Sequence, residues 1–239
     1  MRLAIIGCLG VRGFLKNKID LCFIFCYFIF VAPKGKFITI EGCEGVGKTT
    51  HIELLKAYCT RRGIDALFTR EPGGTPIAES IRNVILHEKS DGMDGLTELF
   101  LYAACRFEHT HKIILPALKS GKVVFCDRYT DSTLAYQGYA RGLDKQVVAD
   151  INQKSSAGVI IECTLFLDLP PALGLARMSK REDKNRLDKE GLDFHNRVYN
   201  GFLEIAKSEP NRVKVINASG AKEQTFEGII ATLKQRGIF

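Results

Sequence analysis

The residue pattern with the clearest chemistry in this 239-residue chain is Gly42-Cys43-Glu44-Gly45-Val46-Gly47-Lys48-Thr49, which has the spacing G-x-x-x-x-G-K-[ST]. It directly follows residues 36–40, a short apolar run typical of a buried strand. Glycines in such a loop let successive backbone N–H groups turn toward an anion, and the next helix directs its positive end at the same anion. Lys48 can reach the outer phosphates of a nucleotide, and Thr49 offers a hydroxyl to a divalent cation. We therefore predict a nucleotide-binding loop that extends to Thr50.

The rest of the body alternates between short strands and helices. Apolar runs that indicate strands occupy residues 66–69, 122–126, 164–168 and 213–216. Helical periodicity is clearest at residues 50–62, 77–87 and 96–119. Strands joined by helix-length crossovers form a parallel sheet covered on both faces, with the ligand site at the carboxyl ends of the strands. We therefore predict one α/β domain over residues 35–239.

The longest helical pattern, residues 96–119, carries an apolar stripe. The stripe consists of Leu96, Leu99, Phe100, Ala103, Phe107, Ile114 and Leu118. Such a stripe can pack against the core or against a second subunit, and the sequence does not distinguish between the two.

The formal charge of +7 is divided unevenly along the chain. Five basic residues and one acidic residue precede residue 35, so +4 lies in this leader and +3 in the rest. A mildly basic body suits an enzyme of phosphorylated small molecules and needs no nucleic-acid partner. The eight cysteines form no C-x-x-C pair and no zinc-site spacing, which favours buried thiols in a reducing cytoplasm.

The leader, residues 1–34, contains a twelve-residue apolar run at residues 21–32, flanked by lysines. The run is short for a membrane span and close in length to a signal-peptide core. Three interpretations are open: a start site assigned upstream of the true one, with Val31 as an alternative start, a real membrane anchor, or a disordered tail. We favour the first, and membrane association is not expected.

The sequence from Lys36 onward resembles bacterial thymidylate kinases. Besides the phosphate loop, the resemblance rests on Thr69-Arg70-Glu71-Pro72-Gly73-Gly74-Thr75, Tyr102-Ala103-Ala104-Cys105-Arg106, Asp127-Arg128-Tyr129, Ser132-Thr133-Leu134-Ala135-Tyr136-Gln137-Gly138 and Leu167-Asp168-Leu169-Pro170-Pro171. It implies the three-layer fold of P-loop NTPases, with a central parallel β-sheet flanked by helices and a mobile basic lid. It also implies transfer of the γ-phosphoryl group of ATP to dTMP, which gives dTDP for dTTP biosynthesis.

The resemblance assigns roles around the phosphates. Lys48 and the loop amides hold ATP, and Thr49 holds Mg²⁺ together with Asp127. Arg70 and Arg128 fix the acceptor phosphate by charge-assisted pairs. Because phosphoryl transfer depends on positioning and charge neutralisation, Lys48 and Arg128 are the expected catalytic residues of this part of the site.

The resemblance also assigns the recognition of dTMP. Tyr102 stacks on thymine, Arg106 and Thr133 hydrogen-bond the base edge, and Gln137 belongs to the same substrate-binding group.

Two further residues concern the sugar of the acceptor. Tyr136 crowds the 2′ side, which disfavours ribonucleotides, and Glu44 contacts the 3′-hydroxyl. A carboxylate in an anion-binding loop is costly unless it has such a task.

Residues 177–186 form a charged stretch that is the candidate lid. An isolated charge run is usually a solvated helix end, but here the loop has no cation other than Lys48. Arg181 or Arg186 is therefore expected to meet charge on the transferred group, as in family members with an arginine-bearing lid. On this view, Arg186→Ala lowers kcat far more than it raises the KM for dTMP. Asn185 and Ala172 depart from the family pattern, which leaves the lid contacts open.

Three other assignments are considered. Another nucleoside-monophosphate or deoxynucleoside kinase on the same scaffold is the nearest alternative. A regulatory GTPase needs N-K-x-D, and Asn152-Gln153-Lys154-Ser155 lacks the aspartate. A membrane-tethered binding module is supported by the leader alone. The family resemblance further implies a homodimer.

Overall fold

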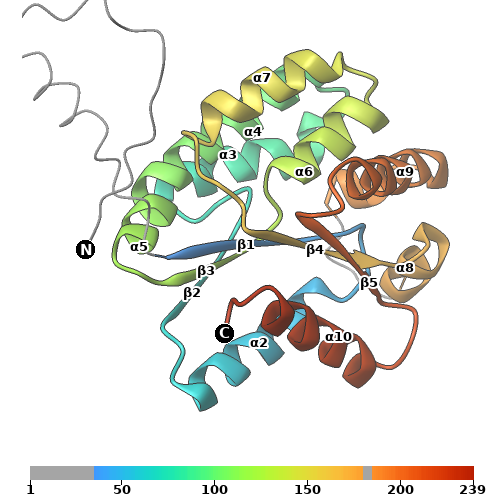
Figure 1. Cartoon of the computed structure of the whole chain (residues 1–239). Coiled ribbons are helices and arrows are strands. Elements are labelled where there is room, and N and C mark those ends of the chain that lie inside the picture. The colour runs from blue at the N-terminus through green and yellow to red at the C-terminus, as the bar shows by residue number, and fades with distance from the viewer. Residues whose placement is uncertain (1–34, 180–184) are drawn as a thin grey trace, which may run out of the picture. The chain divides into compact units, whose positions relative to one another are not determined.

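The computed structural model describes residues 35–179 and 185–239 and is built on a sheet of five parallel strands (Figure 1). The leader and Arg181 lie outside the described residues. The strands are β1 (Lys36–Glu41), β2 (Ala66–Arg70), β3 (Val123–Asp127), β4 (Cys163–Asp168) and β5 (Val213–Asn217). Their order across the sheet is β2-β3-β1-β4-β5. The predicted parallel α/β sheet is confirmed, and the strand bounds move by one residue.

The register brings the carboxyl ends of the strands to one edge. Ile40 of β1 pairs with Asp127 of β3, and Asp127 also pairs with Arg70 of β2. On the other side of β1, Ile40 pairs with Leu165 of β4. The segments that follow β1, β2 and β3 therefore meet at the same edge of the sheet.

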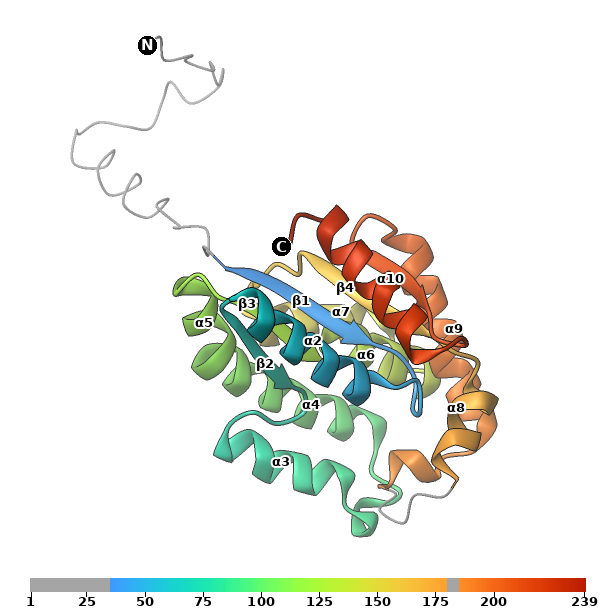
Figure 2. The ribbon, with the colours of Figure 1, turned by 90° about the horizontal axis from the view of Figure 1, so that it is seen from below.

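Helices cover both faces of the sheet and give the fold three layers (Figures 1 and 2). One face carries α2 (Lys48–Arg62) and α10 (Lys222–Gln235). The other face carries α4 (Gly95–His109), α5 (Leu115–Lys119), α7 (Lys145–Ser155) and α9 (Leu192–Ser208). Shorter or more peripheral helices are α3 (Pro76–Leu86), α6 (Thr130–Thr133) and α8 (Pro171–Met178). The central strands β1 and β4 are largely buried because both faces of the sheet are covered.

The phosphate loop is shaped by two glycines in the left-handed region. Gly45 has φ +72° and Gly47, which precedes α2, has φ +95°. Gly45 also lies against the backbone of Gly174 in α8, where a Cβ atom would overlap a carbonyl oxygen. The loop is thus braced from outside by α8, and side chains are excluded at this contact.

The predicted helix over residues 96–119 is interrupted. It consists of α4, a wide π-helical segment (Thr110–Ile114) and α5. Asp94 begins α4 by accepting hydrogen bonds from the backbone N–H groups of Leu96 and Thr97. The wide segment leads into Pro116, which has no N–H to donate and whose ring would collide with a carbonyl of a regular turn.

The apolar stripe of this helix is partly buried and partly exposed. Leu99, Ile114 and Leu118 are buried in the core. Leu96, Phe100 and Phe107 are 41%, 56% and 51% exposed. The stripe therefore contributes to the core and also leaves an apolar face on α4.

A buried carboxylate ends β1. Glu41 accepts hydrogen bonds from the backbone N–H of Tyr129 at 2.8 Å and from Ser132 Oγ at 2.6 Å. Burial raises the pKa of Glu41 from 4.5 to about 7, and the nearby Asp131 acts in the same direction. Glu41 thus ties β1 to the segment that follows β3.

We expect Glu41→Gln to change how stability depends on pH. Because the folded protein raises the pKa of Glu41, its contribution to stability is fully present below about pH 4.5 and is lost as pH rises through about 7. Relative to wild type, the variant should therefore gain about 2–3 kcal/mol of unfolding free energy between about pH 5 and pH 8. Urea denaturation at both pH values measures this difference, and parallel curves for the two proteins would contradict it.

Candidate active site

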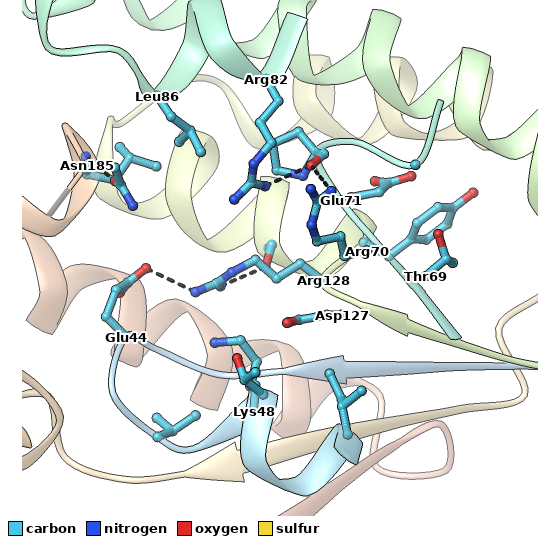
Figure 3. Close-up of a pocket in the computed structure, with 18 of the residues that line it drawn as sticks. Glu44, Lys48, Thr69, Arg70, Glu71, Arg82, Leu86, Asp127, Arg128 and Asn185 are labelled. Carbon is cyan, nitrogen blue, oxygen red and sulfur yellow. Dashed lines mark hydrogen bonds and ion pairs between the residues drawn. The ribbon is translucent and has the colours of Figure 1, made fainter. Parts of the chain in front are cut away.

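A cavity of about 1050 Å³ opens at the carboxyl edge of the sheet. Its walls come from the phosphate loop, the segments after β2 and β3, and helices α3 and α4. Figure 3 shows Lys48 and Asp127 on one side of this space, Arg70 and Arg82 on the other, and Arg128 between them. The predicted site residues that line the cavity are Glu44, Gly45, Val46, Gly47, Lys48, Thr49, Thr50, Arg70, Tyr102, Arg106, Asp127, Arg128, Thr133, Tyr136 and Gln137.

The ammonium of Lys48 is held by its own loop. Nζ donates to the carbonyl oxygens of Gly42 at 2.9 Å and Cys43 at 3.1 Å. Burial and the neighbouring Arg128 lower the pKa of Lys48, and an anion bound in the loop would oppose this shift. The Cys43 thiol is itself buried, which raises its pKa to about 12.

Asp127 offers an oxygen to a cation. Its Oδ1 atom is buried and has no hydrogen-bond partner among the described residues. Such an atom is costly unless a ligand or ion meets it. Thr49, in the first turn of α2, lines the same cavity. Residues 35–179 and 185–239 contain no cluster of three metal-binding side chains, so a divalent cation here would also need oxygens from phosphate and water.

Two arginines form the far wall of the cavity. Arg70 donates to both carboxylate oxygens of Glu79, at 2.7 and 3.0 Å, and this pairing lowers the pKa of Glu79 to about 2. Arg82 of α3 donates to the carbonyl oxygen of Pro72 at 2.8 Å, and burial lowers its pKa. Arg82 was not predicted from the sequence, because an isolated arginine in a helix usually lies on the solvent face.

Arg128 lies between the two walls in a strained conformation. Its φ of 67° is in the left-handed region, which a non-glycine residue adopts when surrounding contacts enforce it. One terminal nitrogen donates to Ser132 Oγ at 3.1 Å and the other to Glu44 Oε1 at 3.0 Å. The guanidinium also lies 5.1 Å from the ring centroid of Tyr136. These contacts fix a cation between the phosphate loop and the far wall.

Glu44 connects the loop to this cation. Its Oε1 atom accepts from Arg128 and from the Tyr136 hydroxyl. Burial alone would raise the pKa of the carboxyl, but Arg128, His195 and Lys48 outweigh burial and lower it to about 2. Glu44 is therefore an ionised acceptor at neutral pH.

Arg106 is fixed in a buried polar network. Its exposed fraction is 1%, and it donates from Nε to Glu71 at 2.8 Å, from Nη1 to Asn152 at 2.7 Å and from Nη2 to Thr133 at 2.8 Å. Three of the five N–H groups of this guanidinium thus donate hydrogen bonds, and these bonds fix the orientation of its plane. Glu71 is held in turn by His109, whose Nδ1 lies 3.0 Å from its second oxygen.

The structure adds residues that sequence analysis did not assign to the site. Arg82 lines the cavity, and Glu71, His109 and Asn152 surround Arg106. Glu71 belongs to the motif at residues 69–75, but nothing in the sequence indicates which side chain it pairs with.

Arg186 does not line the cavity. It is 5% exposed, donates to the carbonyl oxygen of Ile85 at 3.1 Å and pairs with the buried carboxylate of Glu98. Gln137 donates to the other oxygen of Glu98 at 2.7 Å. The structure therefore does not bring Arg186 to Lys48, and the lid role of Arg186 stays a prediction.

Known proteins of similar sequence indicate the family of this chain. The family model described as thymidylate kinase matches residues 40–229. A thymidylate kinase of Clostridium novyi (strain NT) is 46% identical over 203 residues, covering 84% of this chain and 99% of that protein. Another from Synechococcus sp. (strain JA-2-3B'a(2-13)) is 48% identical over 200 residues, covering 84% and 95%.

This chain belongs to the thymidylate kinase family. The crystal structure of thymidylate kinase from Ehrlichia chaffeensis is similar in fold, with a TM-score of 0.68 and 36% identity over 84% of this chain and 98% of that chain. The predicted family, P-loop fold and kinase class are confirmed. As a member of the thymidylate kinase family, the protein is a phosphotransferase that uses ATP to phosphorylate dTMP.

We expect Arg186→Met to lower the unfolding free energy by about 3 kcal/mol, because the variant leaves the Glu98 carboxylate buried without its closest cation. The loss should be at the low end for a buried pair, since Arg141 stays 3.3 Å from Glu98. Adding Glu98→Gln should recover much of the stability, and chemical denaturation of the wild type and these two variants measures this. A large loss of kcat with unchanged stability would contradict the anchoring role and support the lid role.

Proposed function

We propose that the cavity holds ATP and dTMP end to end and passes the γ-phosphoryl group from one to the other. The observation that carries this proposal is that the phosphate loop and three arginines, Arg70, Arg82 and Arg128, line the same cavity. Phosphoryl transfer requires two anionic ligands in line, with cations around the moving group. A loop for one ligand and an arginine group for the other meet this requirement.

ATP is assigned to the phosphate loop. The backbone N–H groups of residues 42–50 and the ammonium of Lys48 would hold its phosphates. Thr49 and Asp127 would hold Mg²⁺, which when bound neutralises charge on the phosphates. The unpaired Oδ1 atom of Asp127 supports this assignment.

The acceptor phosphate is assigned to the arginines. Arg128 donates one N–H to Glu44 and one to Ser132, so its other N–H groups are available to the phosphate of dTMP. Arg70 and Arg82 supply positive charge from the opposite wall. Arg128 would thereby act in catalysis, since it lies between the two phosphate sites. A contribution of Arg186 to transfer would require it to leave Glu98.

The base of dTMP is assigned to the pocket around Arg106. Tyr102 would stack on the pyrimidine, a contact worth about 0.5–1.5 kcal/mol beyond burial. Arg106, Thr133 and Gln137 would read the base edge. Because Arg106 is already oriented by three hydrogen bonds, little conformational freedom is lost when the base binds.

The sugar of dTMP is assigned to Tyr136 and Glu44. The Tyr136 hydroxyl donates to Glu44, which fixes the ring beside the phosphate loop. Glu44 carries an oxygen that can accept a hydrogen bond from the 3′-hydroxyl, and the ring of Tyr136 would occupy the space of a 2′-hydroxyl.

A coupled assay of ADP release with dTMP, dUMP, dCMP, AMP and thymidine tests the acceptor. We expect dTMP to have the highest kcat/KM. The value for dUMP should be lower by roughly 10–200-fold, because one methyl group in a pocket is worth about 1–3 kcal/mol. Equal use of dCMP, AMP or thymidine would contradict the proposal and favour another kinase of the same fold.

We also propose a homodimer formed by the apolar face of α3 and α4. These two helices pack against each other, and Ile77 and Val84 of α3 are exposed, as are Leu96, Phe100 and Phe107 of α4. Apolar side chains gathered on neighbouring helices are typical of a subunit interface, and closed dimers use the same face of both copies.

The Phe100→Glu variant tests the dimer. A charge buried in the proposed interface should convert the dimer to a monomer, which light scattering after size-exclusion chromatography measures. The control is Ile160→Glu, at an exposed position outside α3 and α4. The proposed interface would be contradicted if the wild type is a monomer, or if Phe100→Glu remains a dimer as the control does.

No helix among residues 35–179 and 185–239 has the length and apolar character needed to cross a bilayer. The described cysteines, Cys43, Cys59, Cys105, Cys126 and Cys163, are buried free thiols. We propose that residues 35–239 form a cytoplasmic kinase domain whose ligands are nucleotides and not nucleic acids. Free thiols agree with a reducing compartment.

A further inference from the structure

His195 is a buried histidine that none of the roles above uses. It lies in the apolar stripe of α9 with Val198 and Phe202 and is 1% exposed. Neither of its ring nitrogens has a hydrogen-bond partner among the described residues. A buried polar group without a partner costs free energy, so an apolar side chain would suit this position better unless the imidazole has a task.

The ring faces the carboxylate of the phosphate loop. Nδ1 of His195 lies 3.2 Å from Glu44 Oε2, although the two atoms are not aligned as a hydrogen bond. The other oxygen of Glu44 is the one that accepts from Arg128 and Tyr136. Each oxygen of the carboxylate therefore has its own neighbours, and His195 is the neighbour of Oε2.

The position of His195 is fixed by packing. Helix α9 runs along the π-helical segment Leu134–Ala140, which carries Tyr136. Phe194 and Phe202 lie with their ring centroids 6.1 and 6.4 Å from that of Tyr136. Because Nδ1 and Oε2 are already 3.2 Å apart, the pair needs a reorientation of the Glu44 carboxylate and not a closer approach to form a hydrogen bond. Helix α9 itself cannot move without disturbing these ring contacts.

We infer that His195 is a positioning residue for Glu44: its Nδ1–H holds Oε2, so that the carboxylate keeps the orientation that accepts the 3′-hydroxyl of the acceptor sugar. The inference rests on the proposed placement of Glu44 beside that sugar. His195 does not line the cavity, so it acts on the acceptor through Glu44. Without it, Glu44 would turn fully toward Arg128, and the contact with the 3′-hydroxyl of the acceptor sugar would be lost.

The experiment compares dTMP with 3′-deoxythymidine 5′-monophosphate as acceptors at saturating ATP, with the full-length protein and its His195→Leu variant. In wild type, dTMP should have the higher kcat/KM. In His195→Leu this preference should fall by about five- to tenfold, which is close to the net contribution of one ordinary hydrogen bond. The fall should come from a higher KM for dTMP, with kcat and the KM for the 3′-deoxy acceptor little changed.

Two further variants separate positioning from packing. His195→Asn places an amide nitrogen near the position of Nδ1 and should keep most of the preference. His195→Gln extends toward the position of Nε2 and should lose it, which also provides the test if His195→Leu does not fold. Thermal denaturation shows that each assayed variant is folded.

The outcomes are distinct. An unchanged preference in both His195→Leu and His195→Gln, or its loss in His195→Asn as well, would overturn the role of His195. A wild-type protein that uses both acceptors equally would instead overturn the placement of Glu44 at the sugar, and this inference with it.

Discussion

The ion pair between Glu44 and Arg128 joins the two halves of the cavity. Glu44 belongs to the loop after β1 and Arg128 follows β3, so the pair depends on the register that sets Ile40 beside Asp127. The pair has a second effect. A cavity that concentrates several cations for phosphate binding would repel itself in the absence of ligand, and Glu44 offsets part of that repulsion inside the phosphate loop.

The same arrangement recurs around the cavity. Arg70 is paired with Glu79 and Arg106 with Glu71. Each carboxylate fixes the plane of a guanidinium before any ligand arrives. Preorganised charges of this kind need no reorganisation when charge moves during phosphoryl transfer, which is the principal electrostatic means of accelerating this reaction. The acidic residues thus carry as much of the site geometry as the arginines do.

The sequence predicted those parts of the site that depend on local pattern. The phosphate loop and the succession of strands and helices along the chain follow from residue spacing and periodicity. The other residues that line the cavity follow from the resemblance to thymidylate kinases. The partners of each charged group did not follow, because Glu71 meets Arg106 and Glu98 meets Arg186 only through tertiary packing. The same applies to Arg82 and His195, whose helical positions look like a surface arginine and a core residue. The π-helical segment Thr110–Ile114 in the long helix was missed because apolar periodicity continues across it.

The burial of Cys43 has a practical consequence for chemical probes of this protein. A cysteine inside a nucleotide-binding loop invites covalent targeting, yet electrophiles react with the thiolate and not with the thiol. With a pKa of about 12 and almost no accessible surface, Cys43 would present scarcely any thiolate to an acrylamide or maleimide reagent. Selective ligands for this site would have to gain their affinity from reversible contacts with the arginines and the base pocket.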